Sequence, residues 1–156
     1  MLDKVDFPLT TSQISEFVLD KGYTSYFKLQ EALSDLAESG LIRTETTHNR
    51  TLYHLTENGA ETILYFSNKI SHAIRKDIDD FLKEKQYDLK EEAAVKSDYY
   101  LNTNREYEVR CQITENGSSL IDLKLTVPTE KEAEAIANHW NAKSQEIYTL
   151  LLSNLL

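Results

Sequence analysis

Apolar residues are spaced three or four positions apart through the first half of the chain. Over residues 11–86 this helical spacing is interrupted by one short alternating stretch. The spacing predicts a helix that is capped by Thr11 or Ser12 and ends before Gly22, where a left-handed stop is expected. It also predicts a second helix over residues 25–39.

The alternating stretch and the segment after it predict a hairpin and two further helices. Residues 41–46 and 51–55 are β-prone and are joined by four residues that include an asparagine, which favours a tight hairpin. Thr56 then opens a third helix that runs through Phe66. An apolar stripe over residues 70–82 predicts a long fourth helix.

The rest of the chain alternates and then becomes helical again. Alternation predicts a strand over about residues 88–99 and a hairpin of residues 107–113 and 121–127. Thr129, followed by an acidic residue at the capping-box position, predicts the start of a final helix. The inner face of that helix should consist of Ala133, Ile136, Ala137, Trp140, Ile147, Leu150 and Leu151. The predicted fold class is therefore α+β, with a small antiparallel sheet packed on a long C-terminal helix.

Two paired helices, a small hairpin and a further helix make up the winged helix-turn-helix plan. Residues 32–42 and 53–59 resemble the helix, Gly-Leu-Ile, wing and Leu-Thr-x-x-Gly run of the MarR-like and PadR-like regulators. Residues 9–14, 22–27 and 120–130 resemble, more closely, a bacterial family labelled as a domain of unknown function or as predicted transcriptional regulators. The resemblance covers nearly the whole chain.

The resemblance implies two domains and no particular ligand, operator or reaction. Residues 1–69 should form an N-terminal winged helix-turn-helix domain, and residues 70–156 a linker helix with the C-terminal sheet and long helix. Only residues 1–5 stand where the family carries a fuller first helix. We therefore expect either a shortened start or less packing surface in the first domain.

The charge of the chain limits how it could bind DNA. Seventeen Lys and Arg against 26 Asp and Glu give a net charge of −9, which disfavours a non-specific polyanion binder. A specific contact needs positioned cations, hydroxyls or helix N-termini. The candidates lie at the start of the second helix and at the hairpin: Thr24, Ser25, Lys28, Arg43, His48, Asn49 and Arg50. They make double-stranded DNA the first candidate partner of a transcriptional regulator.

Two alternatives keep the same fold without DNA. The second helix also carries Glu31, Asp35 and Glu38, which suit an interaction module that binds another protein. A ligand-sensing module is the other alternative, and it leaves the effector unidentified. Tyr99, Tyr100, Tyr107 and Trp140 are candidates to line its pocket, although such aromatic residues are more often core or interface.

The end of the final helix is apolar almost all round and predicts a homodimer. Such a surface in a small protein needs a second partner, and a frayed terminus is the alternative. The candidate interface consists of Trp140, Ile147, Leu151, Leu152, Leu155 and Leu156. No basic residues flank it, which disfavours a membrane contact.

Residues for catalysis or metal binding are scarce. Cys111 is the only cysteine, so the chain has no internal disulfide and no cysteine-based zinc site, and it is expected inside a strand pair as a small buried residue. His48, His54, His72 and His139 are too widely spaced for a metal site. We expect no enzyme activity, no cofactor and no metal, and a cytoplasmic protein without a membrane segment.

Overall fold

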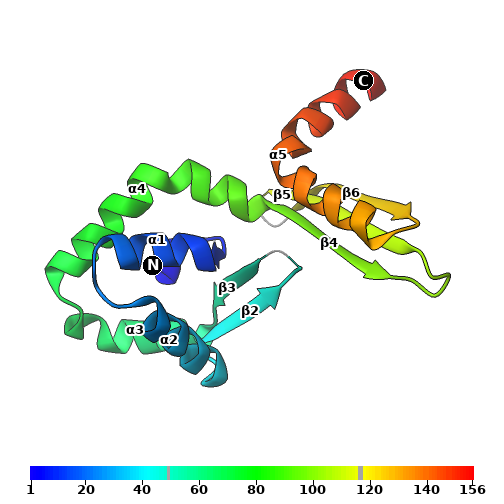
Figure 1. The fold of residues 1–156 in the computed structure, drawn as a ribbon. Helices are drawn as coiled ribbons and strands as arrows, with labels where there is room; N and C mark the ends of the chain where they lie inside the picture. The colour runs from blue at the N-terminus through cyan, green and yellow to red at the C-terminus, as the bar shows by residue number, and fades with distance from the viewer. Residues whose placement is uncertain (49, 116–117) are drawn as a thin grey trace. The chain divides into compact units, whose positions relative to one another are not determined.

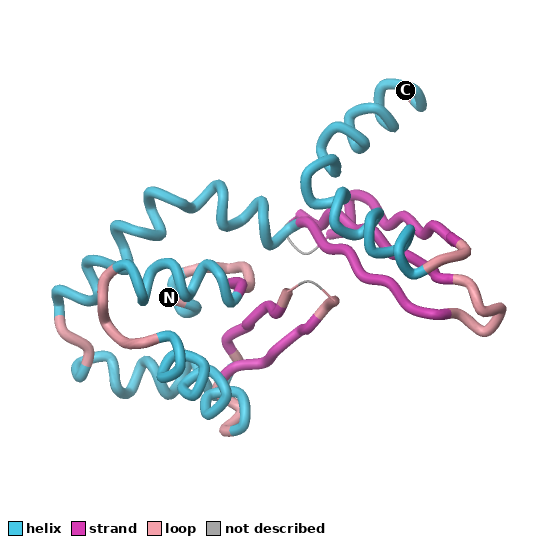
Figure 2. Tube along the Cα trace, viewed as in Figure 1, coloured by secondary structure: helices cyan, strands magenta, loops and turns pink. Residues whose placement is uncertain are grey.

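The computed structural model describes residues 1–48, 50–115 and 118–156 and shows a mixed α+β protein (Figure 1). Consecutive helices and consecutive strands follow one another along the chain, and the described strands form two antiparallel three-stranded sheets (Figure 2). In the described residues the elements are the 3-10 helix η1 (Leu2–Lys4), β1 (Leu9–Thr10), α1 (Thr11–Asp20), α2 (Tyr26–Glu38), β2 (Ile42–Thr46), β3 (Thr51–Leu55), α3 (Glu57–Phe66), the 3-10 helix η2 (Ser67–Lys69), α4 (His72–Ala94), β4 (Val95–Leu101), β5 (Tyr107–Glu115), β6 (Ser118–Val127) and α5 (Glu130–Leu155).

The chain divides into two compact units. The first comprises residues 1–46 and 50–93, and the second comprises residues 47–49 and 94–156. The sequence analysis placed the division at residues 69 and 70, but α4 packs with the first unit. Its Phe81 ring lies 5.2 Å from the Phe17 ring of α1, and its Lys85 forms an ion pair with Glu16.

The first unit is built around a sheet with the strand order β1-β3-β2. Leu9 of β1 lies opposite Tyr53, and Ile42 of β2 lies opposite Leu55. The helices α1 and α2 bury their apolar faces against this sheet, which confirms the two predicted helices. The buried residues of this core are Leu9, Ile14, Leu29, Leu33, Ile42 and Tyr53.

The start of α1 differs from the prediction by one residue. Thr10 is its N-cap: the Thr10 hydroxyl accepts from the Gln13 backbone N–H at 3.2 Å, and the Gln13 side chain accepts from the Thr10 N–H at 2.9 Å. The same residue ends β1, a strand that the sequence pattern did not predict.

The helix α4 extends further than predicted. A strand was expected from about residue 88, and this is wrong, because the chain stays helical to Ala94 and β4 begins at Val95. Leu82, Leu89 and Ala93 are all buried and lie seven and four positions apart, so the helical stripe continues through this segment.

The second unit is a sheet with the order β4-β5-β6, covered on one face by α5. The β5–β6 hairpin and the capping box of Thr129 and Glu132 confirm two predictions, and Cys111 is fully buried as expected. The buried core of this unit is Val95, Val109, Cys111, Ile113, Ala133, Ala137 and Trp140.

The apolar stripe of α5 continues past its covered part. Ala133, Ala137, Trp140 and Ser144 are buried, and Ile147 is half-buried. The prediction that Leu150 belongs to the inner face is wrong, since its side chain is 60% exposed. Among the described residues, no helix combines the length and the apolar character needed to cross a membrane.

Candidate nucleic-acid interface

The first turn of α2 exposes a cation and a hydroxyl. Ser25 is the N-cap residue in extended conformation, but its side chain makes no capping hydrogen bond, and Thr24 just before it is half-buried. Lys28 is exposed, and no carboxylate of the described residues lies within ion-pair distance of its ammonium group. The first backbone N–H groups of a helix lack intrahelical partners, so this end of α2 can receive an anion.

The exposed surface of α2 is aromatic near the start of the helix and acidic toward its end. Phe27 is 83% exposed and packs edge to face against Tyr26, with the two ring centroids 5.9 Å apart. Toward the C-terminal end the exposed residues are Glu31, Asp35 and Glu38. Lys28 and Glu38 are ten residues apart, about 15 Å along the axis, so the cation and the last carboxylate lie at different ends.

The hairpin β2–β3 contributes one exposed cation. Arg43 lies on β2 directly opposite His54, whose Nε2 is 3.2 Å from Oε2 of Glu45. Residues 43 and 45 share one face of the strand, so a carboxylate stands beside the guanidinium. Arg43 is therefore a candidate phosphate contact in a mixed electrostatic setting.

Arg50, another of the predicted DNA contacts, makes a hydrogen bond within the first unit. Its Nη1 donates to the backbone carbonyl of Glu92, in the last turn of α4, at 2.7 Å. The guanidinium is largely buried, and this burial lowers the pKa of Arg50 despite the nearby Glu92 and Glu45 carboxylates. Arg50 therefore links the base of the hairpin to α4.

The other two tip residues offer little further support for a contact. His48 belongs to the second unit, where its ring stacks on Tyr99 with centroids 3.9 Å apart and its Nδ1 pairs with Asp98. Asn49 lies outside the described residues. Of the candidate contacts, Ser25, Lys28, Arg43 and His48 are exposed, and Thr24 and Arg50 are half-buried.

The predicted dimer interface divides into core and exposed residues. Trp140 is buried in the core of its own unit and donates from Nε1 to the Gln112 carbonyl at 3.2 Å, so it cannot face a partner. Ile147 packs on the same core. Leu151, Leu152, Leu155 and Leu156 remain exposed.

The candidate aromatic pocket is filled by its own side chains. Tyr99, Tyr107 and Trp140 pack in the core of the second unit, whereas Tyr100 is exposed and its hydroxyl donates to Glu108. Within residues 1–48, 50–115 and 118–156, no cluster of His, Cys, Asp and Glu could hold a metal ion.

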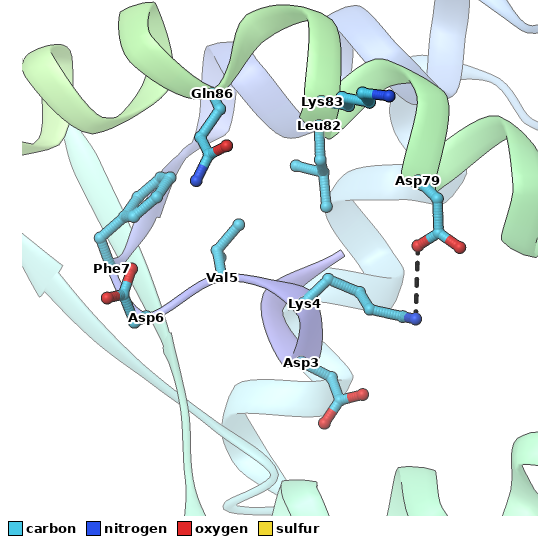
Figure 3. Close-up of a pocket in the computed structure, with 9 residues that line it drawn as sticks. All are labelled: Asp3, Lys4, Val5, Asp6, Phe7, Asp79, Leu82, Lys83 and Gln86. Carbon is cyan, nitrogen blue, oxygen red and sulfur yellow. Dashed lines mark ion pairs between the residues drawn. The ribbon is translucent and has the colours of Figure 1, made fainter.

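An open cavity of about 580 Å³ lies in the first unit between residues 3–7 and α4 (Figure 3). Val5, Phe7 and Leu82 line its apolar part. At its rim Lys4 forms an ion pair with Asp79, with Nζ and Oδ1 3.3 Å apart. The lining also includes Asp3, Asp6 and Lys83, so carboxylates outnumber cations around the cavity.

A protein-family model described as "Domain of unknown function (DUF4364)" matches residues 1–155. No curated protein and no solved structure matches the chain.

Proposed function

We propose that this chain, which belongs to the DUF4364 family over nearly its whole length, is a DNA-binding transcriptional regulator that acts as a homodimer. The family description names no activity, so the proposal rests on the geometry of the chain. The observation that carries this proposal is the strand order β1-β3-β2 around the paired helices α1 and α2.

The order of elements in the first unit is the one that a winged helix requires. A short strand precedes two helices, and a hairpin follows whose second strand lies between the first strand and its own partner. In this plan the second helix enters the major groove and the hairpin is the wing. The helix α2, with 13 residues, is about 20 Å long, which suits a groove about 12 Å wide.

Only a few side chains would make the proposed contact with DNA. Lys28 and Arg43 would neutralise phosphates, and the hydroxyls of Thr24 and Ser25 would position the helix. With two cations per protomer, a dimer would release about four counterions, so the logarithm of the affinity should fall with the logarithm of the salt concentration with a slope of about −4. The weak electrostatics favour a regulator that depends on specific base contacts.

A second function is favoured by the same helix. The exposed aromatic ring of Phe27 stands next to a face that carries Glu31, Asp35 and Glu38. Exposed aromatic residues are typical of the centres of protein interfaces, and carboxylates can steer a basic partner. An interaction module that binds another protein through α2 is therefore the alternative.

The two functions are separated by selecting bound sequences from a random duplex pool and titrating the best duplex by fluorescence anisotropy. A regulator gives saturable binding that weakens with salt. Lys28→Ala and Arg43→Ala should each lower the magnitude of the slope by about two, because a homodimer carries each residue twice. Lys69→Ala serves as the matched control, because Lys69 is an exposed cation of the same unit outside the proposed contact. An interaction module gives no enrichment and no saturable binding at low salt.

A further inference from the structure

The strand β6 forms a long edge of the second sheet. It has ten residues, and β5 is the strand that pairs with it in the described part of the chain. One side of β6 therefore carries backbone N–H and C=O groups without a strand partner. Edge strands are usually blunted by proline, charge or bulges. Here Pro128 comes only after the strand ends, and the register shift falls at its beginning, opposite Ile113 and Thr114.

The apolar face of β6 is incompletely covered. Ile121, Leu123 and Leu125 lie opposite Ile113, Cys111 and Val109 of β5. The three β5 residues are buried, but Leu125 is 38% exposed, and Ile121 and Leu123 are only half-buried. A further strand placed beside β6 would cover this apolar edge.

The polar face of β6 carries one carboxylate and one cation, and each is paired with β5 within the chain. Lys124 lies directly opposite Arg110, and like charges in this position oppose each other. Asp122 compensates Arg110, with Oδ1 2.9 Å from Nε, while Lys124 reaches Glu108 at 3.0 Å. Asp122 and Lys124 thus stand two residues apart on the face of an open edge.

We propose that β6 pairs antiparallel with β6 of a second copy of this chain, with Leu123 opposite its own equivalent at the two-fold axis. This register places Asp122 opposite Lys124 of the second copy, twice over. On the other face it places Ile121 opposite Leu125 of the second copy. Each face of β6 is therefore complementary to itself, which is the condition for an isologous interface.

The neighbouring registers are worse on the charged face. Centring the axis on residue 122 sets Asp122 against Asp122, and centring it on residue 124 sets Lys124 against Lys124, which places like charges directly opposite. A slip by a single residue turns the apolar set of one strand to the polar side. The pair of charges and the leucine between them therefore select one alignment.

This inference rests on the proposed function only for the homodimer, and DNA binding has no part in it. In the proposed dimer, the second units of the two copies form one continuous six-stranded sheet. The exposed leucines at the end of α5 are a separate surface, so the two can be tested independently.

The register is tested by disulfide trapping in the full chain. In the Leu123→Cys variant the two new thiols would face each other with Cβ atoms about 5 Å apart, close to the separation that a disulfide bridges. In the matched Leu125→Cys variant they would be four residues out of line, about 13 Å apart. All variants are made in a Cys111→Ala background, because Cys111 lies directly opposite residue 123 on β5 and its thiol would otherwise compete within the chain.

Mild oxidation should convert most of the Leu123→Cys variant to a covalent dimer, and little of the Leu125→Cys variant or the parent chain. Equal dimer formation by both variants, or by neither, overturns the register. Because residue 123 contributes to packing, a second pair of variants uses the exposed face. Asp122→Cys mixed with Lys124→Cys should form far more covalent dimer than either variant alone.

The outcomes separate this inference from the proposed function. If sedimentation shows a dimer while neither trapping experiment succeeds, the edge pairing is wrong and the homodimer stands. If the parent chain sediments as a monomer at the concentrations of the trapping experiments, both the edge pairing and the homodimer are wrong. DNA binding is measured by anisotropy and is read out separately from either result.

Discussion

The side-chain amide of Gln13 donates to Oε2 of Glu92 at 2.7 Å, linking the start of α1 to the last turn of α4 across 79 residues. The same Gln13 accepts from the Thr10 N–H in the capping box and is almost fully buried. One side chain thus satisfies the end of one helix and holds a second helix beside it.

Replacing Gln13 should therefore destabilise the first unit. Gln13→Ala removes the reciprocal cap and leaves a buried backbone N–H unsatisfied, so we expect the free energy of unfolding to fall by about 2 kcal/mol. The measurement is urea unfolding followed by circular dichroism. Gln86→Ala, an exposed glutamine of α4, is the control and should change stability by less than about 0.5 kcal/mol. Equal effects of the two variants would show that the link is not stabilising.

Arg50 and Arg43 should behave differently although both lie in the hairpin. Arg50→Ala removes a half-buried donor to the Glu92 carbonyl and should lower the free energy of unfolding by about 1–2 kcal/mol. Arg43→Ala should leave stability within about 0.5 kcal/mol, because the side chain is exposed. Thermal melts of both variants check this. A neutral Arg50→Ala would return Arg50 to the list of candidate DNA contacts.

Gly59 is required by a close approach of the backbone. A Cβ at this position would lie 2.0 Å from the carbonyl oxygen of Leu41, and this atom cannot move freely because it accepts from Thr56. Gly59→Ala should therefore cost about 3 kcal/mol or prevent folding of the first unit. Gly40→Ala is the comparison: nothing lies near its Cβ, and its φ of +71° alone should cost about 1 kcal/mol. A milder effect at Gly59 than at Gly40 would contradict the packing described.

Cys111 should make stability depend on pH in the alkaline range. Its burial favours the neutral thiol and raises its pKa from 9.0 to about 11 in the folded chain. The folded state then holds the proton more tightly, so this contribution is fully present below pH 9 and is lost as the pH rises to 11. The loss is on the order of 2 kcal/mol.

The difference between the parent chain and Cys111→Ala isolates this effect, because tyrosines and lysines titrate equally in both. Urea unfolding at several pH values from 8 to 11 should show the two proteins converging or crossing as the pH rises. A constant difference would mean that the thiol titrates normally. In addition, the native thiol should react slowly with a thiol reagent at pH 8 and rapidly after unfolding.

The elements followed from the sequence wherever a local pattern decided them. The apolar spacing of α2, the asparagine in the hairpin connection and the capping box at Thr129 each act within a few residues, and the corresponding elements are present. The strand β1 has only two residues, and its pairing with β3 joins residues more than 40 positions apart. No local signal distinguishes such a strand from a loop.

The end of α4 could not be predicted from the sequence for a different reason. Ala93, Val95 and Tyr99 fit a strand alternation, but Leu82, Leu89 and Ala93 fit a helical stripe equally well. The packing of α4 on α1 decides between them, and that contact is not local.

The candidate site was predictable in part for the same reason. The exposure of Lys28 follows from the helical wheel of α2, whereas the burial of Arg50 depends on a backbone carbonyl 42 residues away. Trp140 was expected at an interface because it is large and lies in an apolar stripe. The apolar stripe runs through both the covered and the exposed part of α5. Which of its residues are buried depends on where the sheet packs against the helix.

Thr10 ends one strand and caps the next helix, so the connection between β1 and α1 has no slack. A single residue inserted after Thr10 would force the chain to keep either the pairing of Thr10 with Leu52 or the cap on Gln13. The turn between β4 and β5 is held by Asn102, whose Oδ1 accepts from the N–H groups of Asn104 and Glu106, so an insertion there disturbs this turn but no helix cap. Tags, fluorophores or affinity handles are therefore best introduced at this second turn.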